Sequence, residues 1–403
     1  MIAEAASQIM PSDELMSRQA HLLSAQLRAL RERLFPPEAQ KTLRRFTSGE
    51  AAKILHVSDG YLRQLSLDGL GPRPETVANG RRLYSLAEIN ELRVLLANLR
   101  PKEALEFLPH RREGDALQVI AVANFKGGSA KTTTSLYLAQ SLALRGYRVL
   151  AVDLDPQASL SSMFGVQPEF DIGENQTLYG AIRYDDQRVE LADIVRKTYF
   201  SGLDIVPANL ELMEFEHETP RAILEKNMRG DELFFRRIGR AIHSIGDQYD
   251  VVVIDCPPQM GYLTLGALCA ATGIIITIHP QMVDVASMSQ FLLMSSELMS
   301  VVRNAGANPT HDFIRYAITR HDPRDGPECQ VVALLRGLFE SNVLTATAWK
   351  STAIANAGLT KQTLYELERG AVGRATYDRA IESIEAVNSE IEQLMRQAWG
   401  RNK

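Results

Sequence analysis

Apolar positions along the chain change their spacing several times, and these changes divide it into four regions. From about Ser12 to Leu34, leucines recur at near-helical spacing with arginines on the other faces, which predicts an amphipathic helix. Residues 44–99 predict short helices and a basic hairpin. Residues 117–340 alternate short, mostly β-branched runs with helical segments, and residues 342–403 are expected to be mostly helical. The expected strands are 119–123, 149–152, 203–206, 251–254, 274–278 and 313–318.

This alternation predicts an α/β fold with a mostly parallel sheet covered by helices on both faces. We expect three parts: an N-terminal helix over 1–43, a small domain of helices and a hairpin with its linker over 44–114, and the α/β domain with C-terminal helices over 115–403. The first helix serves either dimerisation or packing on its own domain, because periodicity does not identify the partner.

Composition narrows the class of protein. The formal net charge is −5, so any nucleic-acid contact must come from local basic patches. The cysteines, Cys256, Cys269 and Cys329, have no metal-ligand spacing and are too few for a disulfide framework, which favours a reducing cytoplasm. The longest apolar stretch, 263–278, is interrupted and shorter than the ~20 residues of a spanning helix. We expect a core helix followed by a core strand there, no signal peptide, and no membrane partner.

Residues 46–84 predict a DNA-binding module. A helix capped by Thr47 or Ser48, a short turn and a second helix over 59–67 form a helix-turn-helix pattern. The hairpin tip at Asn79-Gly80 and the strand after it would form a basic wing, and this part resembles MerR-like DNA-binding domains. The alternative is a small helical module with a solvated charged face. The expected DNA contacts are Ser58, Tyr61, Arg63 and Gln64 in a groove, and Arg81 and Arg82 at phosphates.

A phosphate-binding loop follows the first expected core strand and opens a helix. Gly127 and Gly128 let backbone amides approach phosphate oxygens, Lys131 would reach the β and γ phosphates, and the Thr132 hydroxyl would ligate Mg²⁺. The loop therefore predicts a P-loop NTPase. Its expected nucleotide-binding residues are Lys126, Gly127, Gly128, Ser129, Ala130, Lys131, Thr132 and Thr133.

This loop departs from the usual consensus, since Phe125 and Ala130 stand at the two consensus glycine positions. What remains is Lys-Gly-Gly-x-x-Lys-Thr, with a second lysine at Lys126. That form resembles the deviant Walker A motif of the ParA/MinD family. The resemblance implies that Lys131 binds phosphate and that Lys126 crosses a dimer interface to the partner's nucleotide.

Acids end two of the expected strands. Asp153 and Asp155 lie two apart at a strand's carboxyl end and therefore point to the same face, into the ligand crevice of an open α/β sheet. Asp255 ends an apolar strand in the Walker B arrangement. Residues 153–157 match the family's Asp-x-Asp-Pro-Gln motif, which implies that Asp153 and Asp255 serve the magnesium shell and that Asp155 orients the attacking water. A capping Asp-Pro turn and a solvated strand end are the alternatives.

Two later segments carry weaker signals. Residues 280–284 follow a core strand where the family often has a nucleotide-pocket loop, and residues 319–324 follow another and would lie near the base. A plain strand-to-helix connection is the alternative for both.

The resemblance covers most of 117–340 and extends to the larger ParA subclass, whose members carry an N-terminal helix-turn-helix. Residues 46–92 and 363–366 look like the RepA partition proteins of repABC plasmids. The resemblance implies ATP and Mg²⁺ as cofactors, an ATP-dependent homodimer that binds DNA non-specifically, a ParB-type partner that stimulates hydrolysis, operator binding and autorepression, and a cytoplasmic, nucleoid-associated location. Candidate non-specific contacts, each otherwise a solvated side chain, are Lys350, Lys361, Arg369, Arg374 and Arg379.

Rival functions are a MinD-like membrane-cycling ATPase, a helix-turn-helix repressor with a regulatory or vestigial nucleotide site, and an iron–sulfur relative. The first needs a basic amphipathic terminal helix, whereas the last helix carries Glu382, Glu385, Glu390 and Glu392. A vestigial site would lack the phosphate-binding residues, which are present. The cysteines do not form a convincing cluster-ligand set.

Overall fold

The computed structural model describes residues 11–34, 41–77, 80–225, 232–307 and 309–401. The chain divides into two compact units, 1–41 and 42–403. In the first unit, α1 (Ser12–Leu34) confirms the helix expected there, and Leu15, Leu22 and Leu23 on it are exposed. Pro36 and Pro37, which the sequence predicts to end this helix, lie outside the described residues. The use of α1 for dimerisation stays a prediction.

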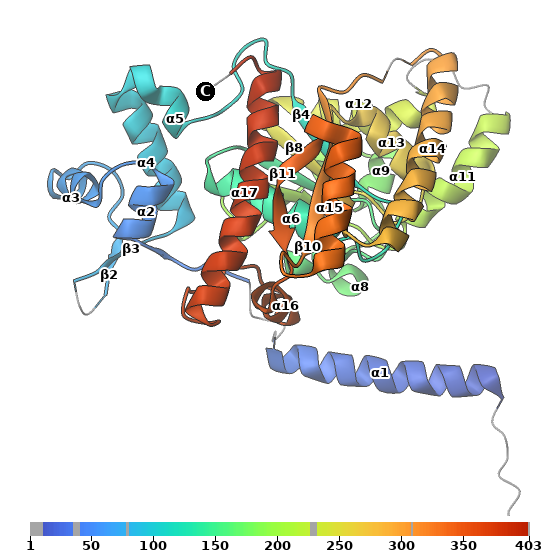
Figure 1. Cartoon of the computed structure of the whole chain (residues 1–403), viewed down its shortest axis with the longest axis horizontal. Helices are drawn as coiled ribbons and strands as arrows, with labels where there is room; N and C mark the ends of the chain where they lie inside the picture. Colours follow the sequence, from blue (N-terminus) through green and yellow to red (C-terminus); the bar gives the residue numbers. More distant parts are fainter. Residues whose placement is uncertain (1–10, 35–40, 78–79, 226–231, 308, 402–403) are drawn as a thin grey trace, which may run out of the picture. The chain divides into compact units, whose positions relative to one another are not determined.

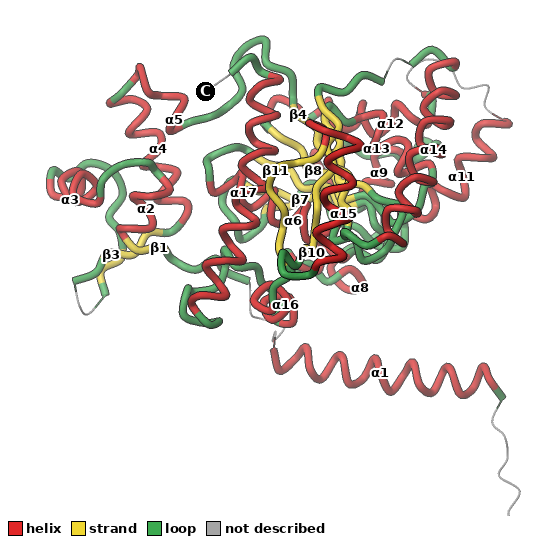
Figure 2. The backbone as a smooth tube through the Cα atoms, viewed as in Figure 1, coloured by secondary structure: helices red, strands yellow, loops and turns green. Residues whose placement is uncertain are grey.

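The second unit is built on an eight-stranded sheet in the order β11-β10-β9-β4-β8-β5-β7-β6, which Figure 2 shows in yellow. All neighbouring strands pair in parallel except β6 and β7. The mostly parallel sheet is therefore confirmed. The strands are β4 (Gln118–Ala123), β5 (Val149–Asp153), β6 (Arg196–Lys197), β7 (Leu203–Val206), β8 (Val251–Asp255), β9 (Gly273–Ile278), β10 (Phe313–His321) and β11 (Val343–Trp349).

Helices cover both faces of this sheet (Figure 1). Alternate residues of β4 enter different buried clusters: Ile120 and Val122 pack with α6 and α17, while Val119 and Ala121 pack with α12 and α13. The helices are α6 (Lys131–Leu144), α7 (Ser159–Met163), α8 (Pro168–Asp171), α9 (Leu178–Ile182), α10 (Leu191–Ile194), α11 (Leu212–Glu225), α12 (Phe234–Ser244), α13 (Tyr262–Ala270), α14 (Met282–Asn304), α15 (Gly326–Phe339), α16 (Thr352–Leu359) and α17 (Arg374–Ala398).

The N-terminal part of this unit carries a small antiparallel sheet in the order β1-β3-β2. Its strands are β1 (Phe46–Thr47), β2 (Glu75–Thr76) and β3 (Arg82–Tyr84), and its helices are α2 (Ser48–Ile54), α3 (Asp59–Leu67) and α4 (Leu86–Leu99). Thr47 caps α2 in a reciprocal capping box with Glu50, which confirms the expected helix start. Asn79 of the expected hairpin tip lies outside the described residues. The winged, DNA-binding interpretation stays a prediction.

A buried arginine joins this part to the α/β layer. Arg93 of α4 is 2% exposed, and its guanidinium donates to the carbonyls of Leu144 (2.6 Å), at the end of α6, and Phe107 (3.2 Å). Burial lowers the pKa of Arg93 to about 10. Phe107 is itself buried in α5 (Ala104–Phe107), so the expected linker over 101–114 contributes to the core that both parts share.

The region after 342 departs from the helical expectation, because β11 is a strand of the large sheet. Val343 and Leu344 are buried, and the strand pairs in parallel with β10. The carboxylate of Glu390 on α17 accepts from the backbone amides of Thr345 and Ala346, each at 3.0 Å. These contacts fix the strand at the sheet's edge.

Among the described residues, α14 is long and apolar enough, by length and composition, to cross a membrane. This segment differs from the stretch 263–278 that the sequence singled out, which forms α13 and β9 as expected. Helix α14 connects the neighbouring parallel strands β9 and β10 and buries Met288 and Phe291 in the core. These are the features of a crossover helix.

Candidate nucleotide site

The glycine loop between β4 and α6 has the conformation of an open phosphate cradle. Asn124 anchors its start: the side-chain amide donates to the Thr277 carbonyl, and its oxygen accepts from the Lys126 amide at 3.0 Å. Gly128 has φ +80°, and a Cβ at Gly127 or Gly128 would meet no heavy atom within 4 Å. Backbone amides can therefore approach a phosphate.

Lys131 lies over this loop. Lys131 is buried, and its Nζ donates to the Lys126 carbonyl at 3.2 Å. Burial lowers the pKa of Lys131, and the nearby carboxylate of Asp255 opposes that shift. A buried cation folded onto a glycine loop at the start of a helix fits the role of a phosphate-binding lysine.

Two fully buried carboxylates face each other beside the loop, because Asp153 and Asp255 are paired positions on β5 and β8. Burial raises the pKa of both, and repulsion from Asp255 adds to the shift at Asp153. The hydroxyls of Thr132 and Ser135 lower the pKa of Asp255 through hydrogen bonds, yet its Oδ2 has no hydrogen-bond partner. A divalent cation would satisfy that oxygen and offset the repulsion, so the residues fit Mg²⁺.

Sequence reasoning missed Ser135, whose Oγ donates to Asp255 Oδ1 at 3.0 Å. Its signal was a hydroxyl residue four positions after Lys131, on the same face of α6. Asp153 has different hydrogen-bond partners from Asp255. Its Oδ2 accepts from the Ser161 amide (2.8 Å) and from the Ser161 hydroxyl (2.7 Å).

Asp155 is the third acid near the loop. It is half-buried, and its charge acts on both Lys131 and Asp255. One carboxylate oxygen accepts from the Gln157 amide at 2.9 Å. Its expected role in orienting the attacking water stays a prediction.

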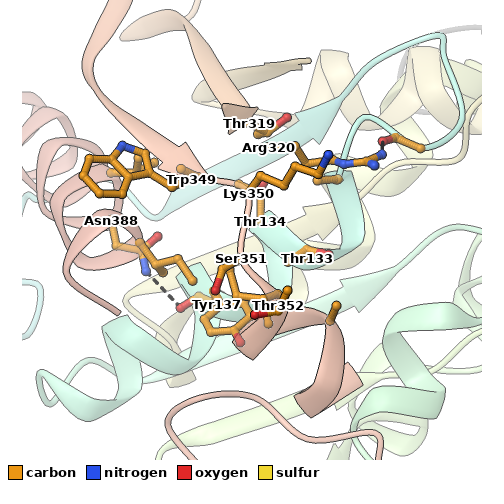
Figure 3. Close-up of a pocket in the computed structure, with 17 residues that line it drawn as sticks. Thr133, Thr134, Tyr137, Thr319, Arg320, Trp349, Lys350, Ser351, Thr352 and Asn388 are labelled. Carbon is orange, nitrogen blue, oxygen red and sulfur yellow. Dashed lines mark hydrogen bonds between the residues drawn. The ribbon is translucent and has the colours of Figure 1, made fainter. Parts of the chain in front are cut away.

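A pocket of about 520 Å³ opens beside the loop, within the range of ligand pockets. Figure 3 shows its walls converging from α6, the end of β10, the β11–α16 connection and α17. Thr319 Oγ1 donates to the Ser129 carbonyl at 3.0 Å and Arg320 to the Gly128 carbonyl at 3.1 Å, so the segment 319–324 does reach the P-loop. Tyr137 and Trp349 supply aromatic walls, which suit a nucleobase.

Sequence reasoning missed the part of this pocket formed by 349–352, because it expected helix after 342. The apolar, β-branched run over 343–349 was the available signal. Lys350, expected as a candidate DNA contact, lines the pocket.

The other expected DNA contacts occupy at least three places: α3 with its N-cap, the β2–β3 hairpin, and the C-terminal region. On α3, Ser58 Oγ accepts from the Tyr61 amide at 3.2 Å, the Tyr61 ring lies 4.7 Å under the Arg100 guanidinium, and Gln64 donates to Asp68 at 2.7 Å. Arg63 is exposed on the same helix, while Arg81 and Arg82 lie at the β2–β3 hairpin. Arg369 is held by the carboxylate of Asp378 at 2.7 Å. DNA binding by any of them stays a prediction.

The comparisons with known proteins agree with this geometry. Sheet, loop and acids together place the chain among the P-loop NTPases of ParA/MinD type. A family model described as an AAA domain matches residues 117–305. The chain is 53% identical over 400 residues to a putative replication protein A of Rhizobium rhizogenes, covering 99% of this chain and 98% of the relative.

A more distant relative, protein SopA of Escherichia coli K12, is 30% identical, with coverage of 90% of this chain and 92% of the relative. A solved partition protein shares the fold, with a TM-score of 0.62, 18% identity, and coverage of 94% of this chain and 98% of that one. The chain belongs to the ParA family of partition ATPases, in its repABC type.

Proposed function

We propose that this chain is an ATP-dependent DNA-segregation ATPase that dimerises on ATP, binds DNA non-specifically in that state, and releases it after hydrolysis stimulated by a ParB-type partner. It acts in the cytoplasm on nucleoid DNA. Through α3 and the β2–β3 hairpin it also binds its own operator and represses its operon.

The observation that carries this proposal is the different placement of the two P-loop lysines. Lys131 is buried over its own loop, where it serves the nucleotide of its own protomer. Lys126 is 38% exposed, and its ammonium pairs with Asp284 of another element. A partly exposed second lysine beside the phosphate loop is what a nucleotide sandwich between two protomers requires.

The chain's own residues have distinct tasks in hydrolysis. The amides of Gly127 and Gly128 and the amine of Lys131 hold the phosphates, and the aromatic pocket holds the base. Thr132, Asp153 and Asp255 hold the cation directly or through water, and Asp155 orients the attacking water. Bound Mg²⁺ supplies charge neutralisation at the transferred phosphoryl group, so positioning and electrostatics suffice for the reaction.

The test is binding to non-operator duplex DNA at fixed salt with no nucleotide, ADP, ATP or a non-hydrolysable ATP analogue, for the parent and Lys131→Ala. Salt is fixed because phosphate contacts dominate such affinities. We expect tight binding only with ATP or its analogue, and its loss in Lys131→Ala. An operator arm with Arg63→Ala separates the two modes, since that variant should lose operator affinity and retain ATP-dependent non-specific binding.

Each other outcome has a distinct meaning. DNA binding that ignores nucleotide would contradict the segregation cycle and favour a repressor with a regulatory nucleotide site. If the protein binds DNA under none of the nucleotide conditions, the result would favour the MinD-like alternative. Binding would then be measured to anionic lipid vesicles in place of DNA. Normal ATP hydrolysis by Lys131→Ala would refute the site assignment.

A further inference from the structure

Lys126 is already engaged within its own protomer, and its partner is a residue of a different element. We propose that Asp284 is a positioning residue that holds Lys126 in cis until ATP-dependent dimerisation draws the lysine to the partner's nucleotide. The inference rests on the ATP-sandwich dimer of the proposed function. It adds the residue that sets the nucleotide concentration at which the dimer forms.

The contact is a short ion pair between a loop and a helix. Lys126 Nζ lies 2.6 Å from Asp284 Oδ1, and the Asp284 side chain is only 6% exposed. Asp284 lies in the first turn of α14, after the N-cap Gln281. A charged hydrogen bond with one buried partner is stronger than a solvated surface pair, so it can hold a flexible lysine in one position.

The surroundings of the second carboxylate oxygen of Asp284 favour retention of its ion pair with Lys126. Asp284 Oδ2 has no hydrogen-bond partner, and it lies 3.6 Å from His279 Nδ1. The opposite nitrogen of His279 lies 3.6 Å from Glu328 Oε1, and Glu328 accepts from the Asp322 amide at 2.7 Å. His279 thus stands between two acids from α14 and α15. Removal of Lys126 would leave a buried carboxylate without its cation, which is costly.

Dimerisation then becomes an exchange of partners for Lys126. The lysine gives up Asp284 and gains the phosphates of the nucleotide across the interface. ATP offers the additional γ-phosphate charge that ADP lacks, so only ATP offsets the loss of the buried pair. In this scheme Asp284 suppresses dimers formed with ADP or without nucleotide.

The experiment measures dimer formation by sedimentation against the concentration of a non-hydrolysable ATP analogue, beside nucleotide affinity of the monomer. The variants are Asp284→Asn, Lys126→Ala and the control Glu297→Gln, which removes a negative charge from the exposed face of the same helix. We expect Asp284→Asn to dimerise at about tenfold lower analogue concentration and to form dimers with ADP, with monomer affinity unchanged. Glu297→Gln should match the parent.

An unchanged or raised midpoint in folded Asp284→Asn would overturn the inference. Dimerisation of Lys126→Ala like the parent would instead refute the ATP sandwich itself, so the two failures are distinguishable. Acylation of lysines in the unaltered, nucleotide-free protein tests the pair if Asp284→Asn does not fold. Lys126 should react several-fold more slowly than the exposed Lys102, and equal rates would contradict the cis pair.

Discussion

Ala130 occupies a backbone conformation that alanine seldom adopts. Its φ is +66° and ψ 29° at the N-cap of α6, in the left-handed region where glycine is favoured. Ala130 stands at a consensus glycine position of the P-loop. The positive φ at this position explains why the consensus residue is glycine. The deviant loop retains the glycine conformation without the glycine, so it stores backbone strain beside the phosphates.

Relief of that strain is measurable. Ala130→Gly should raise the free energy of unfolding by up to about 1 kcal/mol, because glycine adopts positive φ at no steric cost. Ala139→Gly, in the buried middle of the same helix, should lower it by about 1 kcal/mol or more. Urea denaturation of both variants checks this, and equal losses in the two would contradict the strained conformation.

The elements with strong periodicity were predictable, and those defined by tertiary contacts were not. Helix α3 and strand β8 lie where alternation and capping placed them, because their apolar spacing is local. Strand β11 was missed although its β-branched run is visible in the sequence, because its pairing with β10 and its contacts with α17 are tertiary. Arg93 could not be predicted as buried, because arginine is almost never buried without partners and its acceptors here are backbone carbonyls.

For the site, the motifs located the loop and the three acids, while tertiary structure supplied the rest. Neither the approach of Asp284 to Lys126 nor the pocket wall at Trp349 follows from any local pattern. Both depend on which strands become neighbours in the sheet, and residues far apart in sequence then meet at its carboxyl edge.

Arg93 links helix α4 to the end of α6 through hydrogen bonds, and the contribution of this link can be tested. Arg93→Ala should lower the free energy of unfolding by about 2–4 kcal/mol, because it leaves a cavity and removes the donors to the carbonyls of Phe107 and Leu144. It should also expose residues 101–114 to proteolysis. Arg63→Ala, on the exposed face of α3, should change stability by no more than about 0.5 kcal/mol. Equal effects of both variants would mean that the Arg93 link contributes little to stability.

At the scale of the whole molecule, residues 42–114 and the α/β layer of the second unit share one hydrophobic cluster. Leu62 and Leu96 of the first part belong to the same buried cluster as Leu138 and Ile391 of the second. Helix α6 begins at the P-loop and ends at the Leu144 carbonyl, which accepts from Arg93. Nucleotide binding at one end of α6 can therefore change the local stability of α4 through rigid, packed contacts.

This continuity predicts one cooperative unfolding transition for residues 42–403. Nucleotide at one hundred times its Kd should stabilise the native state by about 2.7 kcal/mol. Trp399 fluorescence in Trp349→Phe, where it is the remaining tryptophan, should report that gain at the α/β layer. Hydrogen exchange of the α4 amides should report the same gain in residues 42–114. Lys131→Ala should abolish both shifts. If the α4 amides exchanged at the same rate with and without nucleotide, the two parts would be energetically separate, and nucleotide control of operator binding would need another route.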